Sequence, residues 1–421
     1  MTSILINTRW TQFVSISVFL FYLLMLSAPS GYSYGSGLLL LGGLVFAVRE
    51  RQWGLSAEDK TLVYVLLAIF MVSVLVLFWH GNKGKTLDQT SRCLLVIPVL
   101  LLLLKKPPKL CHMWGGVAVG VIAAAGLAYW QTHWLGVPRA AGHVTSAIPF
   151  GDMGLMMGIL CAAGLFWTGT LARRVWLWRV LLILGLLAGA YCAVASETRG
   201  AWLAIPLVLP LFAVAFIGRR NAMQTTVGTL ALLALLAGGF VLVGGDQLLQ
   251  RYDLAVAGLN NYVDNRTVGT DVGVRLEAWR AATIMIGEQP WLGWSTEDYA
   301  ARLHQLAADK RVDPIVQTLA NTHNNFLDAW VLQGVLGFLA LLALFVLPFW
   351  FFCRRLRAPD MTVRVLAVCG ASLIASFAMF GMTHVILGRN SGILFFLISL
   401  LLFWACMRAR EAAAGPPLRL P

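Results

Sequence analysis

The sequence predicts an all-α integral membrane protein, and three observations support this fold class. The 421 residues are 59% hydrophobic and only 12% charged, whereas a soluble domain carries roughly 25% charged residues. Apolar blocks of about 20 residues recur from end to end of the chain, and a helix of that length crosses the roughly 30 Å hydrocarbon layer. The blocks are continuous, which excludes the alternating pattern of a transmembrane β-barrel.

Twelve of these blocks are predicted to span the membrane, so that both termini lie on the same side. The first is interpreted as an uncleaved span, although it resembles a secretory signal peptide. The tenth is longer than a perpendicular span needs and is expected to tilt or project. The blocks lie near residues 11–28, 36–48, 61–79, 93–104, 113–130, 153–171, 180–195, 201–217, 224–243, 325–352, 365–382 and 392–407.

The distribution of lysine and arginine predicts which side the termini face. One set of short loops contains RER, KKPPK, ARRVWLWR, GRRN and CRRLRAPDMTVR, whereas the other set is poor in these residues. Short basic loops stay in the cytoplasm, so both termini are predicted to be cytoplasmic. The net charge of +13 would suggest a nucleic-acid partner in a soluble protein. Here it is assigned to topology, which leaves the lipid bilayer as a predicted partner and no nucleic acid.

One sizeable extramembrane segment is predicted, a helical loop domain at residues 244–324 that faces away from the cytoplasm. It separates residues 1–243, which hold spans one to nine, from residues 325–421, which hold spans ten to twelve and a short cytoplasmic tail.

Two helices are predicted within this outer segment. Asp271 is expected to cap the first, which Gly287 and Pro290 end. Ser295 and Asp298 form the capping-box pattern that begins the second. The first helix has residues at helical spacing, namely Leu276, Trp279, Ala282 and Ile286.

The sequence predicts no metal and no cofactor. The seven cysteines fall in spans or at their edges, without a CxxC pair, which indicates neither a disulfide framework nor a zinc site. No D-x-D triplet occurs, and the adjacent acids Glu58 and Asp59 fall on the predicted cytoplasmic side. A metal-held diphosphate is therefore not expected.

Two arginines outside the spans are candidates for chemistry. Arg199 lies in the short loop SETRGAW, where it either anchors the chain at the membrane interface or binds an anion. The adjacent Gly200 favours the anion, because a glycine lets backbone and ligand come close. Arg275 lies at the start of a predicted helix, whose positive end favours anions, although a solvated helix surface explains the same position.

A histidine is the third candidate. His323 is followed by Asn324 and Asn325 where the outer segment re-enters the membrane. An interface histidine and ordinary asparagine N-caps would explain this segment without catalysis. Two guanidiniums and an imidazole at one wet surface, however, can hold a diphosphate and remove a proton from a hydroxyl.

Three motifs resemble those of the O-antigen ligase family, within the larger group that includes O-antigen polymerases and protein O-oligosaccharyltransferases. They are SETRGAW at 196–202, RLEAWRAATIMIGEQPWLGWS at 275–295 and HNNFLDAWVLQGVLG at 323–337. The resemblance implies the C-type membrane glycosyltransferase fold and an inverting, metal-independent enzyme. Its donor would be a glycan on undecaprenyl diphosphate, and its acceptor a sugar hydroxyl of lipid A-core at the periplasmic face of a bacterial inner membrane.

The resemblance also implies roles for individual residues. His323 would be the general base, and Arg199 and Arg275 would bind the diphosphate leaving group. Substrate contacts are expected from Asn324, Asn325, Trp279 and Arg389. If His323 is a phosphate ligand instead, the next candidates for proton acceptor are Asp328 and Glu197.

Other functions remain open at this stage. O-antigen polymerases and protein O-oligosaccharyltransferases share the donor and therefore the motifs. A ligase is favoured because the chain lacks the extended C-terminal domain that protein O-oligosaccharyltransferases often carry. A polyprenyl-lipid flippase or 12-span transporter should show ionisable residues at mid-membrane, whereas the predicted spans are nearly free of charge at their centres.

Overall fold

The computed structural model describes residues 2–50, 53–144, 146–217, 253, 256–260, 262 and 268–414. Helices are the only regular secondary structure in these ranges, which confirms the all-α class. They are α1 (Thr2–Leu24), α2 (Gly31–Arg49), α3 (Ala57–His80), α4 (Ser91–Lys105), α5 (Leu110–His133), α6 (Ala147–Trp167), α7 (Val175–Ala195), α8 (Arg199–Trp202), α9 (Ile205–Phe216), α11 (Asp271–Glu288), α12 (Thr296–Ala308), α13 (Asn325–Cys353), α14 (Met361–Thr383) and α15 (Asn390–Ala414), with short 3₁₀ turns that include η1 (Gly84–Leu87), η3 (Pro314–Thr318) and η4 (Ile386–Gly388).

Nine helices in the described ranges are long and apolar enough to cross a membrane, namely α2 to α7 and α13 to α15. The first predicted span coincides with α1, and the eighth with the shorter apolar stretch Gly200–Phe216. The ninth, near 224–243, lies outside the described residues. The protein is thus built like a multi-pass membrane protein, and the number twelve stays a prediction.

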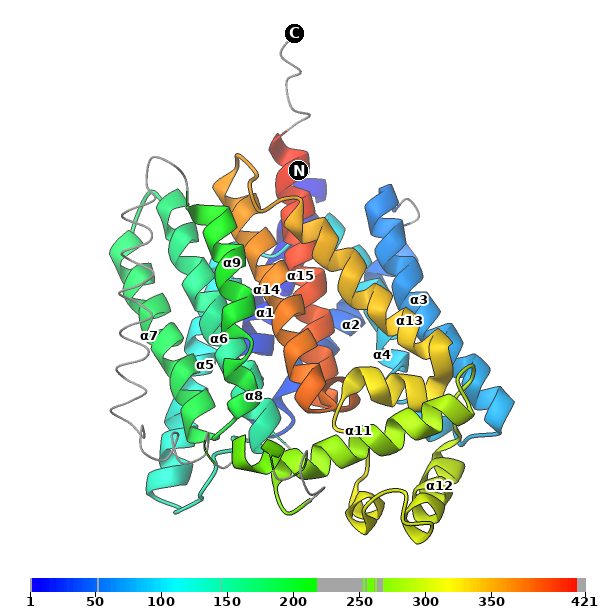
Figure 1. The fold of residues 1–421 in the computed structure, drawn as a ribbon. Coiled ribbons are helices and arrows are strands. Elements are labelled where there is room, and N and C mark those ends of the chain that lie inside the picture. Colours follow the sequence, from blue (N-terminus) through cyan, green and yellow to red (C-terminus); the bar gives the residue numbers. More distant parts are fainter. Residues whose placement is uncertain are drawn as a thin grey trace.

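The long helices form one bundle with two distinct ends (Figure 1). At one end, which we call the terminal end, α1 begins and α15 ends. At the other, which we call the α11 end, α11 lies across the bundle and α12 lies beyond it at one side (Figure 1). The two terminal helices therefore share an end, as an even number of crossings requires.

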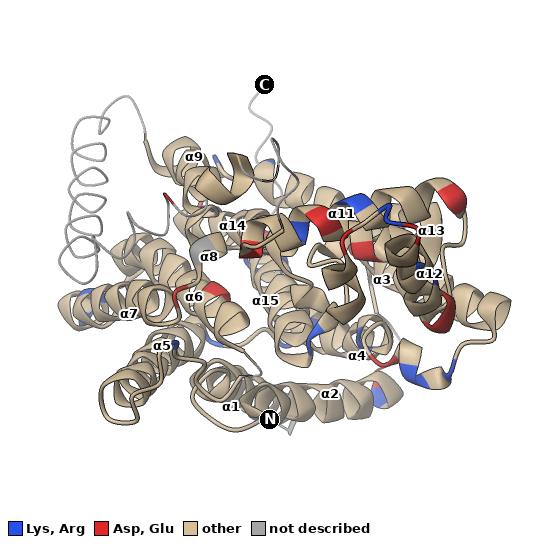
Figure 2. Cartoon of the chain, turned by 60° about the horizontal axis from the view of Figure 1, so that its bottom comes forward, with Lys and Arg blue, Asp and Glu red and all other residues tan. Residues whose placement is uncertain are grey.

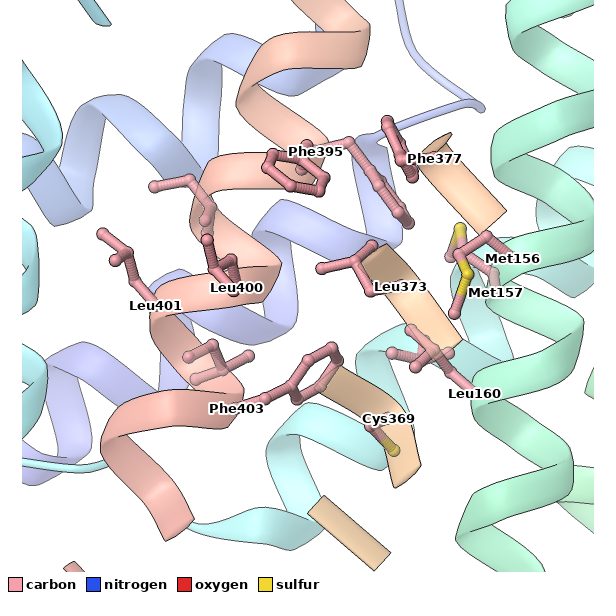
Figure 3. Close-up of a cluster of buried hydrophobic side chains, with 14 of the residues drawn as sticks. Met156, Met157, Leu160, Cys369, Leu373, Phe377, Phe395, Leu400, Leu401 and Phe403 are labelled. Carbon is pink, nitrogen blue, oxygen red and sulfur yellow. The ribbon is translucent and has the colours of Figure 1, made fainter. Parts of the chain in front are cut away.

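The centre of the bundle is packed from α6, α14 and α15 (Figure 3). Met157 of α6 faces Leu373 of α14, and the rings of Phe377 and Phe395 stack with their centroids 5.8 Å apart. Large apolar side chains such as Leu41 and Phe78 remain exposed on outward faces, as contact with lipid requires. These packed central helices give the loops between them fixed positions.

The outer segment has a small core of its own. Met285 of α11, Leu306 of α12 and Val316 of η3 are buried together with Val331 of α13. Ser295 begins α12 as predicted, because its hydroxyl accepts a hydrogen bond from the Asp298 N–H at 3.0 Å.

The expected cap of α11 was wrong by one residue. Thr270, not Asp271, is the N-cap, and its hydroxyl accepts from the Gly273 N–H at 3.1 Å. Asp271 is instead the first helical residue, where its carboxylate complements the positive helix end.

A break at Gly334 explains why α13 is longer than one span. Gly334 has φ 63° and ψ −166°, and the residues of the loop after α11 dock there. The Val335 N–H donates to the Pro290 carbonyl at 2.8 Å, and the Trp294 N–H to the Val331 carbonyl at 2.8 Å. A Cβ on Gly334 would overlap the Trp291 carbonyl, so only glycine fits both the backbone angles and the close approach.

The break divides α13 into a part that is long enough to span the membrane and a part that lies at the α11 end. Residues 335–353, at about 1.5 Å per residue, cover roughly 28 Å and are enough to cross the hydrocarbon layer. The preceding turns run along the α11 end of the bundle (Figure 1). The extra length of the tenth apolar block thus carries His323 to the α11 end.

Candidate active site

The loop before α13 holds His323 in a constrained conformation. His323 has φ 54°, in the left-handed region, which costs a non-glycine residue roughly 1–2 kcal/mol. Hydrogen bonds from its neighbours fix this conformation. The Asn321 side chain accepts from the His323 N–H at 3.0 Å, and the Asp328 carboxylate accepts from the Thr322 N–H at 3.2 Å.

Asn324 and Asn325 both have structural hydrogen bonds. Asn324 is the N-cap of α13, and its side-chain oxygen accepts from the Phe326 N–H at 2.9 Å. The side-chain oxygen of Asn325 accepts from the Leu387 N–H at 3.3 Å, which ties the start of α13 to the turn between α14 and α15. Their expected contacts with substrate stay a prediction.

Two arginines from distant segments act on His323. Arg275 lies in the second turn of α11, and Arg389 directly precedes α15. The pKa of His323 is lowered below its ordinary value of 6.5, first by burial and then by the positive charges of Arg275 and Arg389, against a smaller opposing effect of Asp271. The imidazole is therefore kept in the neutral form that a general base needs near pH 7.

Trp279 follows Arg275 by one helical turn and so lies on the same face of α11. Its indole N–H is buried and has no hydrogen-bond partner in the described part of the chain. Indole N–H groups normally find a partner when buried. This unsatisfied donor is consistent with the predicted substrate contact of Trp279, which stays a prediction.

The SETRGAW segment is packed between α6 and α14. The Thr198 hydroxyl donates to the Ala147 carbonyl at 3.1 Å. A Cβ on Gly200 would lie 2.7 Å from the Thr383 hydroxyl, so the absence of a side chain lets α8 approach the end of α14. The backbone of Arg199 begins α8, and its side chain lies outside what the structure describes.

Glu197 in the same segment also has a left-handed backbone, with φ 53°. Its carboxylate lies 3.8 Å from Arg139, whose Nε donates to the Ser196 carbonyl at 3.1 Å. The other alternative proton acceptor, Asp328, accepts hydrogen bonds from Thr322. Both acids thus have partners that hold loops in place.

Two ionisable residues that the sequence analysis missed lie at this end. His384 directly follows α14 and is 5% exposed. Asp152, near the start of α6, is fully buried, and neither of its carboxylate oxygens has a partner among the residues described. Asp152 lies within electrostatic reach of Arg275. In the sequence Asp152 stands directly before the predicted span at 153–171. The structure places it inside α6, where an acid is rarely placed for packing.

The site is thus assembled from separate stretches of chain at the α11 end. Figure 2 shows acidic and basic residues along α11 and α12, at the end where these stretches meet. Across the described ranges, no group of three or more histidines, cysteines or acids is arranged to hold a metal ion. The arrangement offers a neutral imidazole beside fixed positive charge, which suits proton removal next to a bound anion.

The family model described as O-antigen ligase matches residues 184–342. This region belongs to the O-antigen ligase family. The O-antigen ligase region runs from α7 through SETRGAW and α11 to the second part of α13. It includes Arg199, Arg275 and His323, and it ends before His384 and Arg389. The resemblance drawn from the three motifs is thereby confirmed.

A relative extends the similarity beyond this region. The chain is 24% identical over 394 residues to an uncharacterized protein of Haemophilus influenzae, across 93% of this chain and 97% of the relative. The similarity to this relative therefore covers most of both chains and is not limited to residues 184–342.

Proposed function

We propose that the protein is a glycosyltransferase that moves O-antigen glycan from undecaprenyl diphosphate to a sugar hydroxyl of lipid A-core. One observation carries the proposal. His323, held in a left-handed conformation, lies in the field of Arg275 and Arg389, which come from separate segments of the chain. The family match supports a reaction of the ligase and polymerase type.

The proposed reaction needs one proton acceptor and one anion site. His323 takes the proton of the acceptor hydroxyl while that oxygen forms a bond to the anomeric carbon of the glycan. The bond from this carbon to the diphosphate oxygen breaks, and its electron pair leaves with undecaprenyl diphosphate. Attack from the face opposite the leaving group inverts the anomeric centre. Arg199 and Arg275 hold the negative charge that develops, since a guanidinium fork matches phosphate oxygens and stays charged.

The proposed location is a bacterial inner membrane with the site facing the periplasm. The terminal end, where α1 begins and α15 ends, lies opposite the α11 end (Figure 1). The excess of lysine and arginine in one set of loops assigns the termini to the cytoplasm. The candidate site at the α11 end would then meet the headgroups of both lipid substrates at the periplasmic surface.

A transfer assay tests the proposal. Purified protein is incubated with a polyprenyl-diphosphate glycan and, in separate reactions, with lipid A-core, a glycan or a protein acceptor, each with and without excess chelator. Extension of lipid A-core, undiminished by the chelator, is expected. Extension of the glycan or the protein alone would assign a polymerase or a protein O-oligosaccharyltransferase instead.

The same preparation separates an enzyme from a transporter. Movement of the lipid-linked glycan across vesicles, without transfer to any of the three acceptors, would contradict the proposal. Activity that the chelator abolishes and magnesium or manganese restores, with the fold unchanged, would contradict the metal-free reaction.

A further inference from the structure

His384 is a buried histidine whose ring makes no hydrogen bond to the described part of the chain. The residue is 5% exposed, and neither Nδ1 nor Nε2 has a hydrogen-bond partner within the described chain. Its backbone is fully engaged, because its N–H donates to the Phe380 carbonyl at 3.0 Å and its carbonyl accepts from the Ile386 N–H at 2.8 Å. Buried polar side chains nearly always have a partner, so a ring that lacks one points to a missing ligand.

The ring of His384 lies beside the ring of His323. Their centroids are 6.2 Å apart, with the ring planes tilted by 41°, and Nδ1 of His323 is also buried without a partner in the part that the structure describes. A direct N–H···N bond of about 3 Å would place the centroids roughly 5 Å apart, whereas one oxygen that accepts from one ring and donates to the other would place them roughly 6 to 7 Å apart. The observed separation fits a single oxygen atom between the two histidines.

The charge state of His384 suits a hydrogen-bond donor to a substrate better than a proton acceptor. Burial, and after it the neighbouring His323, Arg389 and Arg275, together lower the pKa of His384 to about 4. At neutral pH the ring is therefore uncharged and offers one N–H donor and one acceptor nitrogen. The N–H of this neutral ring can donate to a hydroxyl oxygen that also contacts the base His323.

The position of His384 links the motifs that hold the two substrates in the proposed reaction. The preceding residue, Thr383, packs against Gly200 of the SETRGAW segment. The following turn is tied to Asn325 of the His-Asn segment through the Leu387 N–H. His384 thus lies between the segment assigned to the diphosphate and the segment assigned to the acceptor hydroxyl.

We propose that His384 is a second histidine of the active site, and that it binds the acceptor hydroxyl oxygen between its own ring and that of His323. This inference rests on the proposed transfer reaction. The N–H of His384 donates to the hydroxyl oxygen and stays on His384 throughout. The hydroxyl proton goes to His323, and the oxygen is oriented for attack on the anomeric carbon. His384 would therefore determine how well an acceptor binds, not how well the donor binds.

Substitutions of His384 that separate size from hydrogen bonding test this role. His384→Phe keeps an aromatic ring without a donor, and His384→Gln keeps a donor of similar reach. His384→Phe is expected to lower kcat/KM for lipid A-core roughly 5- to 100-fold, the range for a binding site that loses one hydrogen bond. His384→Gln should retain more activity than His384→Phe, and both should bind the polyprenyl-diphosphate glycan as tightly as the wild type. His304→Phe, on the exposed face of α12, is the matched control and should transfer normally.

Each other outcome identifies what is wrong. Full kcat/KM in His384→Phe, or equal losses in His384→Phe and His384→Gln with donor binding intact, would overturn the role of the N–H. Loss of donor binding with an unchanged KM for the acceptor would make His384 a phosphate ligand and overturn the inference too. If His384→Phe unfolds at a lower temperature than the wild type, its ring does not fit, and His384→Leu replaces it in the comparison with His384→Gln. Absence of transfer by both the wild type and His304→Phe would instead contradict the proposed function itself.

Discussion

The two ends of the helical bundle differ in how their buried polar side chains are paired. At the terminal end, Arg355 of the loop after α13 donates to Glu58 at 2.8 Å and to Glu411 at 2.6 Å. Arg408 pairs with Glu411 at 3.1 Å, and the Trp404 indole donates to Asp59 at 2.8 Å. This ionic cluster joins α3, α13 and α15, and each of its carboxylates has a cationic or N–H partner.

At the α11 end, three titratable groups are buried without such pairing. Asp152, His323 and His384 each have a buried ring or carboxylate atom with no hydrogen-bond partner in the described ranges. The nearby arginines Arg275 and Arg389 lower the pKa of both histidines.

This difference in pairing distinguishes residues that stabilise the fold from residues that are available to bind or react with a substrate. An ionic cluster with paired carboxylates joins helices, whereas a buried polar group without a partner costs about 1–3 kcal/mol. Such an unpaired buried group is expected where a bound ligand supplies the missing hydrogen-bond partner. The comparison therefore predicts that substitutions at the α11 end change activity, and that substitutions in the ionic cluster change stability.

The largest effect is expected from His323. His323→Ala removes the proposed base and should lower the transfer rate on the order of 100- to 10,000-fold, the span for general acid–base catalysis. His323→Asn should do the same while tolerating the left-handed backbone. Thermal unfolding in detergent and donor binding should remain as in the wild type.

The opposite pattern would assign His323 to the phosphate. If either variant abolishes donor binding and saturating donor restores single-turnover chemistry, His323 is an anion ligand. The proton would then pass to Asp328 or Glu197.

A medium effect, on stability alone, is expected from the ionic cluster. Arg355→Met keeps much of the side-chain length but removes the guanidinium that donates to both Glu58 and Glu411. The free energy of unfolding should fall by about 1–3 kcal/mol, measured as a lower thermal midpoint. The value of kcat/KM should stay within about twofold of the wild type.

Arg410→Met provides the matched control, because Arg410 pairs with Asp360 at 2.9 Å but is largely exposed. An exposed pair contributes about 0–1 kcal/mol, so this variant should be nearly as stable as the wild type. A large loss of kcat in folded Arg355→Met would contradict the claim that the ionic cluster affects stability and not activity.

The smallest effect is expected in the pH dependence of transfer. The pKa of His323 is lowered, so the acid limb of kcat/KM, where the ring takes up a proton, should lie at a lower pH than an ordinary histidine would give. Arg389→Gln removes a positive charge and should raise the midpoint of this acid limb. Asp271→Asn removes a negative charge and should lower it.

Measuring kcat/KM against pH at low and high salt checks the cause. Both shifts should shrink as salt screens the exposed charges. Shifts of the two variants in the same direction would show that another group governs the acid limb.

The sequence by itself determined the membrane class, most helix positions, the second outer helix that begins at Ser295 and the three motifs. These features are local. A span is set by the summed transfer of consecutive apolar side chains, and a cap by residues three apart. The cap of α11 at Thr270 was missed by one position, because a threonine and an aspartate stand side by side there and both are good caps.

Only the tertiary structure decided how α13 is divided and which polar groups meet. The sequence predicted 325–352 as a single span, and its break depends on the docking of Pro290 and Trp294 at Gly334 from a separate segment. His384 has an ordinary local context, and its significance comes from its burial and from the ring of His323 beside it. Burial and missing partners are properties of contacts between segments far apart in the chain, which local residue patterns do not encode.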